Sequence, residues 1–172
     1  MQTSFTDKQL QDKDNKTSET IIRKCVHCGM CNATCPTYQV NGEELEGPRG
    51  RIYLIKDMLE NKKPATKEIA KHIDSCLSCY SCMTTCPSGV NYMHLIDHGR
   101  NYVEETYKRP FLDRVFRNIL SFVLPRPKMF LLMALSSKLI KPFSFLFPKF
   151  IRNALNLMPD KIPGKKLKDQ KV

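Results

Sequence analysis

The feature that most constrains this chain is a cysteine pattern that occurs twice. One copy spans residues 25–36 and the other residues 76–87, and each reads C-x₂-C-x₂-C-x₃-C-P. This is a spacing with which cysteine thiolates ligate [4Fe–4S] clusters. All eight cysteines of the chain lie in these two motifs, so none is left for a disulfide framework. The pattern therefore predicts a protein that binds two [4Fe–4S] clusters.

The fourth cysteine of each motif is followed by proline, which directs the chain away from the first three ligands. In two-cluster proteins with this spacing, the fourth cysteine ligates the other cluster. The sequence therefore predicts a crossed arrangement. Cluster 1 would be bound by Cys25, Cys28, Cys31 and Cys86, and cluster 2 by Cys76, Cys79, Cys82 and Cys35.

The segments between and after the motifs have helical rather than strand periodicity. Apolar residues recur at three- and four-residue spacing over residues 49–60 and 91–107, and a further helix is expected after Pro64. Ser18 is expected to cap a short helix that leads into Cys25, and residues 37–45 are expected to form a loop after Pro36. No alternating run predicts a strand. The expected fold class is mainly α, an α-helical ferredoxin-like two-cluster domain followed by amphipathic helices.

Four segments are expected along the chain. They are a mobile N-terminal arm (residues 1–17), a two-[4Fe–4S] α-helical domain (18–109), a basic amphipathic helical docking region (110–159) and a disordered basic tail (160–172). A cluster domain this small rarely holds together by apolar burial alone, so the clusters would serve as cross-links.

The positive charge of the chain is concentrated in its last third. Residues 1–107 contain 13 Lys and Arg against 14 Asp and Glu, whereas residues 108–172 contain 15 against 3. Nucleic acid, an anionic membrane surface or an acidic partner subunit would each explain such a region. Its longest unbroken apolar run, residues 129–135, is far shorter than the ~20 residues of a membrane-spanning helix. Docking helices rather than membrane spans are therefore expected.

Several other residues have both a functional and an ordinary interpretation. His27 lies between two cluster ligands and either donates to a cluster sulfur or is an ordinary loop residue. Arg49 and Arg51 either neutralise the clusters or are surface charges. The other histidines are expected to be surface or packing residues; they are His72, His94 and His98.

No catalytic motif accompanies the cysteines. The sequence contains no Gly-rich dinucleotide fingerprint and no P-loop, so no catalytic residue is proposed and the chain is expected to be a non-catalytic redox subunit. Zinc competes for cysteine clusters, and a zinc-stabilised nucleic-acid binder is the weakest alternative because the basic region has no recognition motif.

The motif at residues 25–38 continues into residues 42–56 in a way that closely resembles the iron–sulfur subunit of bacterial glycolate oxidase. Residues 85–90, 109–110 and 123–127 extend the resemblance. It implies that all eight cysteines are cluster ligands in a membrane-associated complex. A flavin-containing subunit would oxidise glycolate to glyoxylate, and the cluster subunit would relay electrons toward a quinone. Family members continue into a domain with two Cys-Cys-Gly signatures, which residues 1–172 do not contain, so the resemblance implies a truncated or split-gene form, or a fragment, with a separate chain as the possible source of that domain.

Two alternatives to a glycolate oxidase subunit remain open. One is the iron–sulfur subunit of a related 2-hydroxy-acid or glycerol-3-phosphate dehydrogenase, and the other is a freestanding two-cluster ferredoxin. The basic amphipathic region favours a subunit, because a free carrier does not need a large docking surface. Residues 1–20 have no apolar signal-peptide core and no twin-arginine pair, so the expected location is cytoplasmic, on the inner face of the cytoplasmic membrane.

Overall fold

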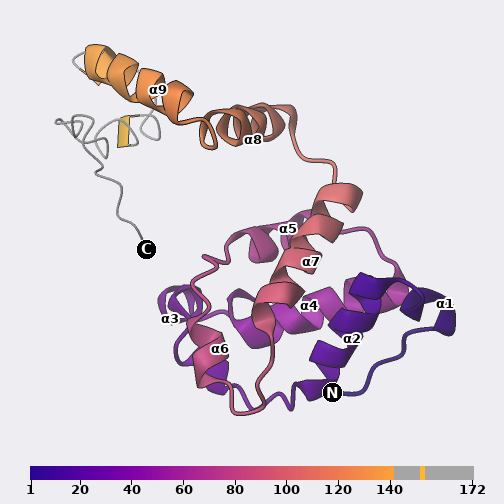
Figure 1. The fold of residues 1–172 in the computed structure, drawn as a ribbon. Coiled ribbons are helices and arrows are strands. Elements are labelled where there is room, and N and C mark those ends of the chain that lie inside the picture. The colour runs from indigo at the N-terminus through magenta and orange to yellow at the C-terminus, as the bar shows by residue number, and fades with distance from the viewer. Residues whose placement is uncertain (142–151, 154–172) are drawn as a thin grey trace, which may run out of the picture. The chain divides into compact units, whose positions relative to one another are not determined.

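The structure, a computed structural model, describes residues 1–141, 152 and 153. The chain divides into two compact units, Met1–Lys108 and Arg109–Val172. Both units are helical, and no strand occurs within these described ranges (Figure 1). The predicted mainly α fold class is confirmed.

The first unit contains the helices that surround both cysteine motifs. They are α1 (Asp7–Leu10), α2 (Lys13–Lys24), η1 (Met30–Asn32), α3 (Pro36–Asn41), η2 (Glu44–Glu46), α4 (Pro48–Asn61), α5 (Lys67–Asp74), α6 (Ser81–Thr85) and α7 (Tyr92–Thr106). Of these, α4 and α7 match the helices predicted from apolar periodicity.

Helix α7 lies at the centre of the first unit and packs against α2, α4, α5 and α6 (Figure 1). The core between these helices is formed by wholly buried apolar side chains, among them Ile22, Ile55, Ile73, Leu95 and Ile96. Each of α2, α4, α5 and α7 therefore contributes to one shared core, which holds both cysteine motifs in place.

The crossing of α4 and α7 depends on a glycine. A Cβ atom added at Gly99 of α7 would lie 2.8 Å from two side-chain atoms of Ile55 in α4. Ile55 is wholly buried and has no space into which to move. Gly99 therefore sets how closely the two helices approach.

Residues 1–17, predicted to be a mobile arm, are instead folded. The N-terminal amine of Met1 donates to the carbonyl oxygen of Cys25 at 2.7 Å, and the buried Gln9 side chain donates to that of Leu59 at 2.9 Å. Met1 and Phe5 also pack against the core. These tertiary contacts stabilise segments whose polar sequence gave no sign of order.

Two local predictions were also wrong. Residues 37–45 do not form one loop, because Pro36 begins α3, as suits a residue without a backbone N–H. Helix α2 begins at Lys13 with Asp12 as its N-cap. Ser18 is not a cap but lies buried within α2, where its hydroxyl is 2.6 Å from Nδ1 of His98.

The second unit contains α8 (Phe111–Val123) and α9 (Pro127–Ile140). Val115, Ile119 and Phe122 of α8 are exposed at helical spacing and line one shallow groove. Among the described residues, no single helix is long and apolar enough to cross a membrane, although α8 and residues 127–136 together reach the required length and apolarity with a bend of 116°. The predicted tail at 160–172 and most of residues 142–159 lie outside the described residues.

Replacing Gly99 with alanine is expected to destabilise the first unit by about 1–3 kcal/mol, because the new methyl group overpacks the contact with Ile55. The expected readout is a lower midpoint of thermal unfolding, followed by circular dichroism at 222 nm. The double variant Gly99→Ala/Ile55→Val should recover part of the loss. An unchanged midpoint in the single variant would contradict the close helix crossing.

Candidate iron–sulfur site

The two cysteine motifs share an unusual backbone conformation. In each motif the residues before and after the second cysteine have positive φ angles: 57° at His27 and 82° at Gly29, and 52° at Ser78 and 56° at Tyr80. Three of these four residues are not glycine, and such a conformation carries strain that the surrounding structure must offset. The same strained conformation therefore recurs around Cys28 and Cys79, which makes both loops candidate binding sites.

The remainder of each motif also follows a repeated path. The third cysteine lies on a short helix, Cys31 on η1 and Cys82 on α6. The N–H of Cys35 donates to the carbonyl of Asn32, and that of Cys86 to the carbonyl of Met83. The two motifs touch where the Thr85 hydroxyl lies 3.2 Å from that of Thr34. Two separate sequence segments therefore form one paired site.

Two cavities lie against the motifs, and each draws cysteines from both. The lining of cavity 1 includes Cys25, Cys28, Cys31, Cys82 and Cys86. The lining of cavity 2 includes Cys35, Cys76, Cys79 and Cys82. Pro48, Cys82 and Tyr92 line both cavities, so the two spaces are neighbours. Cys35 thus lies with three cysteines of the second motif, and Cys86 with three of the first.

The cysteines differ in exposure and acidity. Cys28 and Cys79 are exposed, whereas Cys25, Cys35 and Cys82 are buried. Burial, with repulsion from neighbouring cysteines, raises the pKa of Cys31 to about 11 and that of Cys82 to about 12. A thiol of such high pKa becomes a thiolate only when a metal centre compensates its charge. The buried cysteines thus suit a bound metal group better than a free thiol role.

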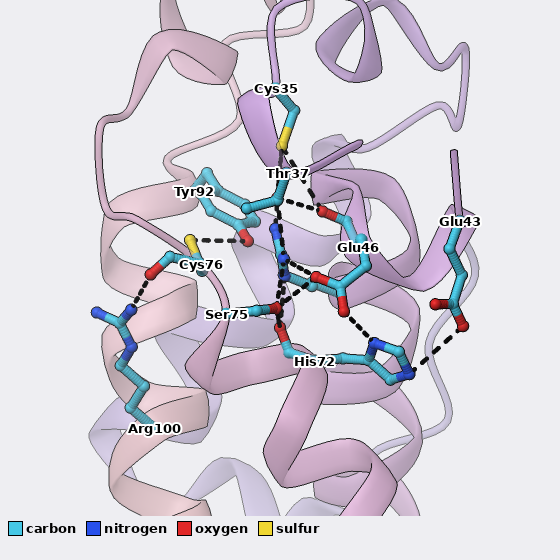
Figure 2. Close-up of polar contacts among 10 residues, drawn as sticks. Cys35, Thr37, Glu43, Glu46, His72, Ser75, Cys76, Tyr92 and Arg100 are labelled. Atoms are coloured by element: carbon cyan, nitrogen blue, oxygen red, sulfur yellow. Dashed lines mark hydrogen bonds and ion pairs between the residues drawn. The ribbon is translucent and has the colours of Figure 1, made fainter. Parts of the chain in front are cut away.

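A buried ion pair between Arg51 and Glu46 supports the wall of cavity 2, and Figure 2 labels its acidic partner, Glu46. Arg51 of α4 and Glu46 of η2 lie 2.8 Å apart, with only 1% and 3% of their side chains exposed. The Arg51 guanidinium also donates to the carbonyl of His72 at 2.7 Å and reaches the Sγ atom of Cys35 at 3.9 Å. This pair links α4, α5 and the fourth cysteine of the first motif.

Glu46 is held in its charged form. Burial on its own would raise the pKa of Glu46, but hydrogen bonds with Ser75 and His72 and the charge of Arg51 lower it below its usual value. Nδ1 of His72 lies 2.8 Å from the Glu46 carboxylate. Removing one partner of such a buried pair typically costs about 3–5 kcal/mol. The pair is therefore a fixed part of the site rather than a mobile surface charge.

The wall of cavity 1 contains different polar groups. Arg49 lines this cavity, but 34% of its side chain is exposed and its Nε atom pairs with Glu44 at 2.5 Å. The buried Nε2 atom of His27 has no hydrogen-bond partner among the described residues. Burial and the nearby charge of Arg49 lower the pKa of His27, which favours a neutral imidazole. Its free ring nitrogen fits a bound acceptor such as a cluster sulfur.

The donor chemistry of both cavities fits an iron–sulfur cluster. Thiolates are soft ligands that select iron–sulfur clusters, zinc or copper(I). In the part of the chain that the structure describes, only Glu43, Glu46 and His72 bring three possible ligand atoms within 4.8 Å of one another. The spacing of both cysteine motifs, C-x₂-C-x₂-C-x₃-C-P, is typical of [4Fe–4S] ligation rather than of a tetrahedral zinc site. An iron–sulfur cluster therefore fits this set of donors best.

Comparison with known proteins defines the class of the site. Residues 21–90 match the family described as a 4Fe-4S dicluster domain. Together, the helical fold, the two cysteine-lined cavities and this match define an α-helical iron–sulfur domain. Iron–sulfur clusters are therefore its cofactor class.

Relatives of known identity narrow this class. The chain is 48% identical over 143 residues to the glycolate oxidase iron-sulfur subunit of Escherichia coli. The aligned region covers 83% of this chain and 35% of that protein. The chain is 32% identical over 117 residues to the probable glycolate oxidase iron-sulfur subunit of Bacillus subtilis, or 65% of this chain and 26% of that protein. The resemblance to the glycolate oxidase iron–sulfur subunit is confirmed.

More distant relatives share a shorter region. The succinate dehydrogenase iron-sulfur subunit of Paracoccus denitrificans is 30% identical over 76 residues, which is 41% of this chain and 29% of that protein. The chain spans about a third or less of the length of these relatives. No solved structure matches it.

The sequence predicted the cysteines of the site but not most of its supporting residues. It left open whether Arg51 was functional, and it treated His72 as an ordinary surface or packing residue. It gave no role to Glu46, Thr37, Ser75 or Tyr92. The only sequence signal for this network is a basic residue on the apolar face of residues 49–60, and its significance depends on burial that only the fold shows.

Proposed function

We propose that the chain binds two [4Fe–4S] clusters in the crossed arrangement. Cluster 1 occupies cavity 1 with Cys25, Cys28, Cys31 and Cys86 as ligands. Cluster 2 occupies cavity 2 with Cys76, Cys79, Cys82 and Cys35 as ligands. The distribution of cysteines between the two cavities supports this assignment, because Cys86 lines only the first and Cys35 only the second. Cys82 lines both cavities, and the spacing of its own motif places it with cluster 2.

The proposed function is electron transfer as the iron–sulfur subunit of a glycolate oxidase (glycolate dehydrogenase) complex. The 48% identity over 143 residues to the Escherichia coli subunit carries this proposal. A flavin-containing partner would oxidise glycolate to glyoxylate, and the clusters would accept its electrons singly and pass them toward a quinone. The succinate dehydrogenase relatives support a role beside a separate catalytic subunit.

The geometry of the first unit suits a short electron relay. Cys28 and Cys79 give each cavity one exposed cysteine, and the cavities share Pro48, Cys82 and Tyr92. An electron would therefore enter near one exposed loop, cross a short shared wall and leave near the other. When bound, the clusters supply the one-electron chemistry, and the protein holds them at a fixed separation.

The second unit is proposed to dock the complex on the inner face of the cytoplasmic membrane. Val115, Ile119 and Phe122 lie on one face of α8, whereas Arg114 and Arg117 lie on the other. A basic helix with one apolar face binds the surface of an anionic bilayer. The residues of α8 thus have the pattern of a helix that lies on a membrane.

Exchange of one ligand tests the crossed assignment. Cys86→Ser should remove or alter cluster 1, although Cys86 belongs to the second motif. EPR spectroscopy of the anaerobically purified variant should still show the signal of cluster 2. The variant Cys76→Ser identifies that signal, because it should lose the signal of cluster 2 and keep that of cluster 1. If Cys86→Ser and Cys76→Ser affect the same cluster, the crossed assignment is wrong.

Vesicle binding tests the docking role of α8. Ile119→Asp should weaken binding to vesicles that contain anionic phospholipid by roughly tenfold, because it places a charge on the apolar face. Ser121→Asp makes the same change in charge on the opposite face and should have a smaller effect. Equal effects of the two variants, or binding that is insensitive to salt, would contradict the docking model.

Reduction of the clusters by substrate tests the enzymatic assignment. The protein should co-purify with a flavoprotein, and anaerobic addition of glycolate to that complex should bleach the cluster absorbance. Glycerol 3-phosphate is the control substrate and should leave the cluster absorbance unchanged. Reduction by glycerol 3-phosphate alone would assign the chain to that dehydrogenase, and isolation without any flavoprotein would favour a freestanding ferredoxin.

A further inference from the structure

The two cavities differ in the polar groups that face their sulfur ligands. The reduction potential of an iron–sulfur cluster depends on nearby charge, on hydrogen bonds to its sulfurs and on exposure to solvent. Positive charge and hydrogen bonds stabilise the reduced cluster, which carries one more negative charge. If the two cavities differ in nearby charge or in hydrogen bonds to sulfur, the clusters in them will differ in reduction potential.

Cavity 2 presents a buried positive charge to one of its ligands. The Nη1 atom of Arg51 lies 3.9 Å from Sγ of Cys35, and the guanidinium is 1% exposed. Glu46 pairs with the other terminal nitrogen of the guanidinium, Nη2, at 2.8 Å, and its carboxylate also contacts Ser75 and His72, as Figure 2 shows for these three labelled residues. The Nη1 atom is therefore the part of the ion pair nearest to the sulfur. A charge in this low-dielectric environment acts more strongly than one in water.

A second donor reaches the same cavity. The hydroxyl of Tyr92 donates to Sγ of Cys76 at 3.8 Å, and 3% of Tyr92 is exposed (Figure 2). Burial raises the pKa of Tyr92 well above its usual value, so this hydroxyl stays protonated. Two of the four sulfurs in cavity 2 therefore have a buried donor nearby, and the exposed Ser81 hydroxyl donates to a third, that of Cys79, at 3.6 Å.

The corresponding groups at cavity 1 are weaker. Arg49 is one-third exposed and is paired with Glu44, so solvent screens its charge. The buried Nε2 atom of His27 has no hydrogen-bond partner among the described residues, so it donates to no ligand sulfur there, unlike Arg51 and Tyr92 at cavity 2. Arg49 and Arg51 lie two residues apart in α4, yet only Arg51 is buried against a ligand sulfur.

We propose that Arg51 raises the reduction potential of cluster 2 above that of cluster 1, which makes cluster 2 the preferred site of the electron and sets the direction of transfer from cluster 1 to cluster 2. Arg51 acts as a positioning and tuning residue through Cys35. With both clusters bound, the transfer step would oxidise cluster 1 by one electron and reduce cluster 2 by one, with no bond formed or broken and no proton transferred. The inference depends on the proposed binding of two clusters.

Redox titration followed by EPR tests this inference on the full chain with its clusters. Wild-type protein should show two midpoint potentials. Arg51→Gln should lower the higher one by the equivalent of at least a tenfold change in the reduction equilibrium, which is about 59 mV for a one-electron couple. Arg49→Gln, the matched control from the same helix, should leave that midpoint unchanged.

Two milder variants keep the test decisive if Arg51→Gln does not retain its clusters. Arg51→Lys preserves the charge and should restore most of the wild-type midpoint, which a purely structural role of Arg51 would not predict. Tyr92→Phe removes one neutral donor and should lower the same higher midpoint by a smaller amount.

Several outcomes would overturn the inference. They are a shift of the lower midpoint in Arg51→Gln or Tyr92→Phe, no shift in either, or an equal loss in Arg51→Lys and Arg51→Gln. Wild-type protein without two [4Fe–4S] clusters would instead refute the proposed function, so the two failures are distinguishable.

Discussion

The structure depends on the meeting of two cysteine motifs that are 40 residues apart in sequence. Each cavity is lined by cysteines from both motifs, with Cys86 at the first and Cys35 at the second. Ligation across this junction would tie the two halves of a small domain together. The apolar core provided by α2, α4, α5 and α7 supports the junction, and the strained loops around Cys28 and Cys79 line the two cavities.

The fold places the buried Arg51–Glu46 ion pair beside a proposed cluster ligand, Cys35. A charged pair contributes little net stability when its desolvation cost is counted. Its place against Cys35 nevertheless brings a buried positive charge to one cavity, whereas the arginine at the other cavity, Arg49, is one-third exposed. The position of this ion pair is therefore explained better by its effect on the reduction potential of a bound cluster than by a contribution to folding stability.

The sequence predicted the features that depend on neighbouring residues, but not those that depend on contacts between residues far apart in the chain. The ligand motifs and helices α4 and α7 were predictable, because cysteine spacing and apolar periodicity are local patterns. The order of residues 1–17 was not, because it depends on contacts of Met1 and Gln9 with distant carbonyls. Helix α3 was predicted as loop because proline can either interrupt a helix or begin one. The role of Arg51 needed its burial, which local sequence does not reveal.

We propose that this chain holds two [4Fe–4S] clusters, each ligated by both motifs. Iron and acid-labile sulfide analysis of anaerobically purified protein, with EPR of its reduced form, measures the cluster content directly. We expect about eight irons and eight sulfides per chain, with signals from two magnetically interacting [4Fe–4S] clusters. Colourless protein that contains zinc, or about four irons per chain with a single isolated signal, would contradict it.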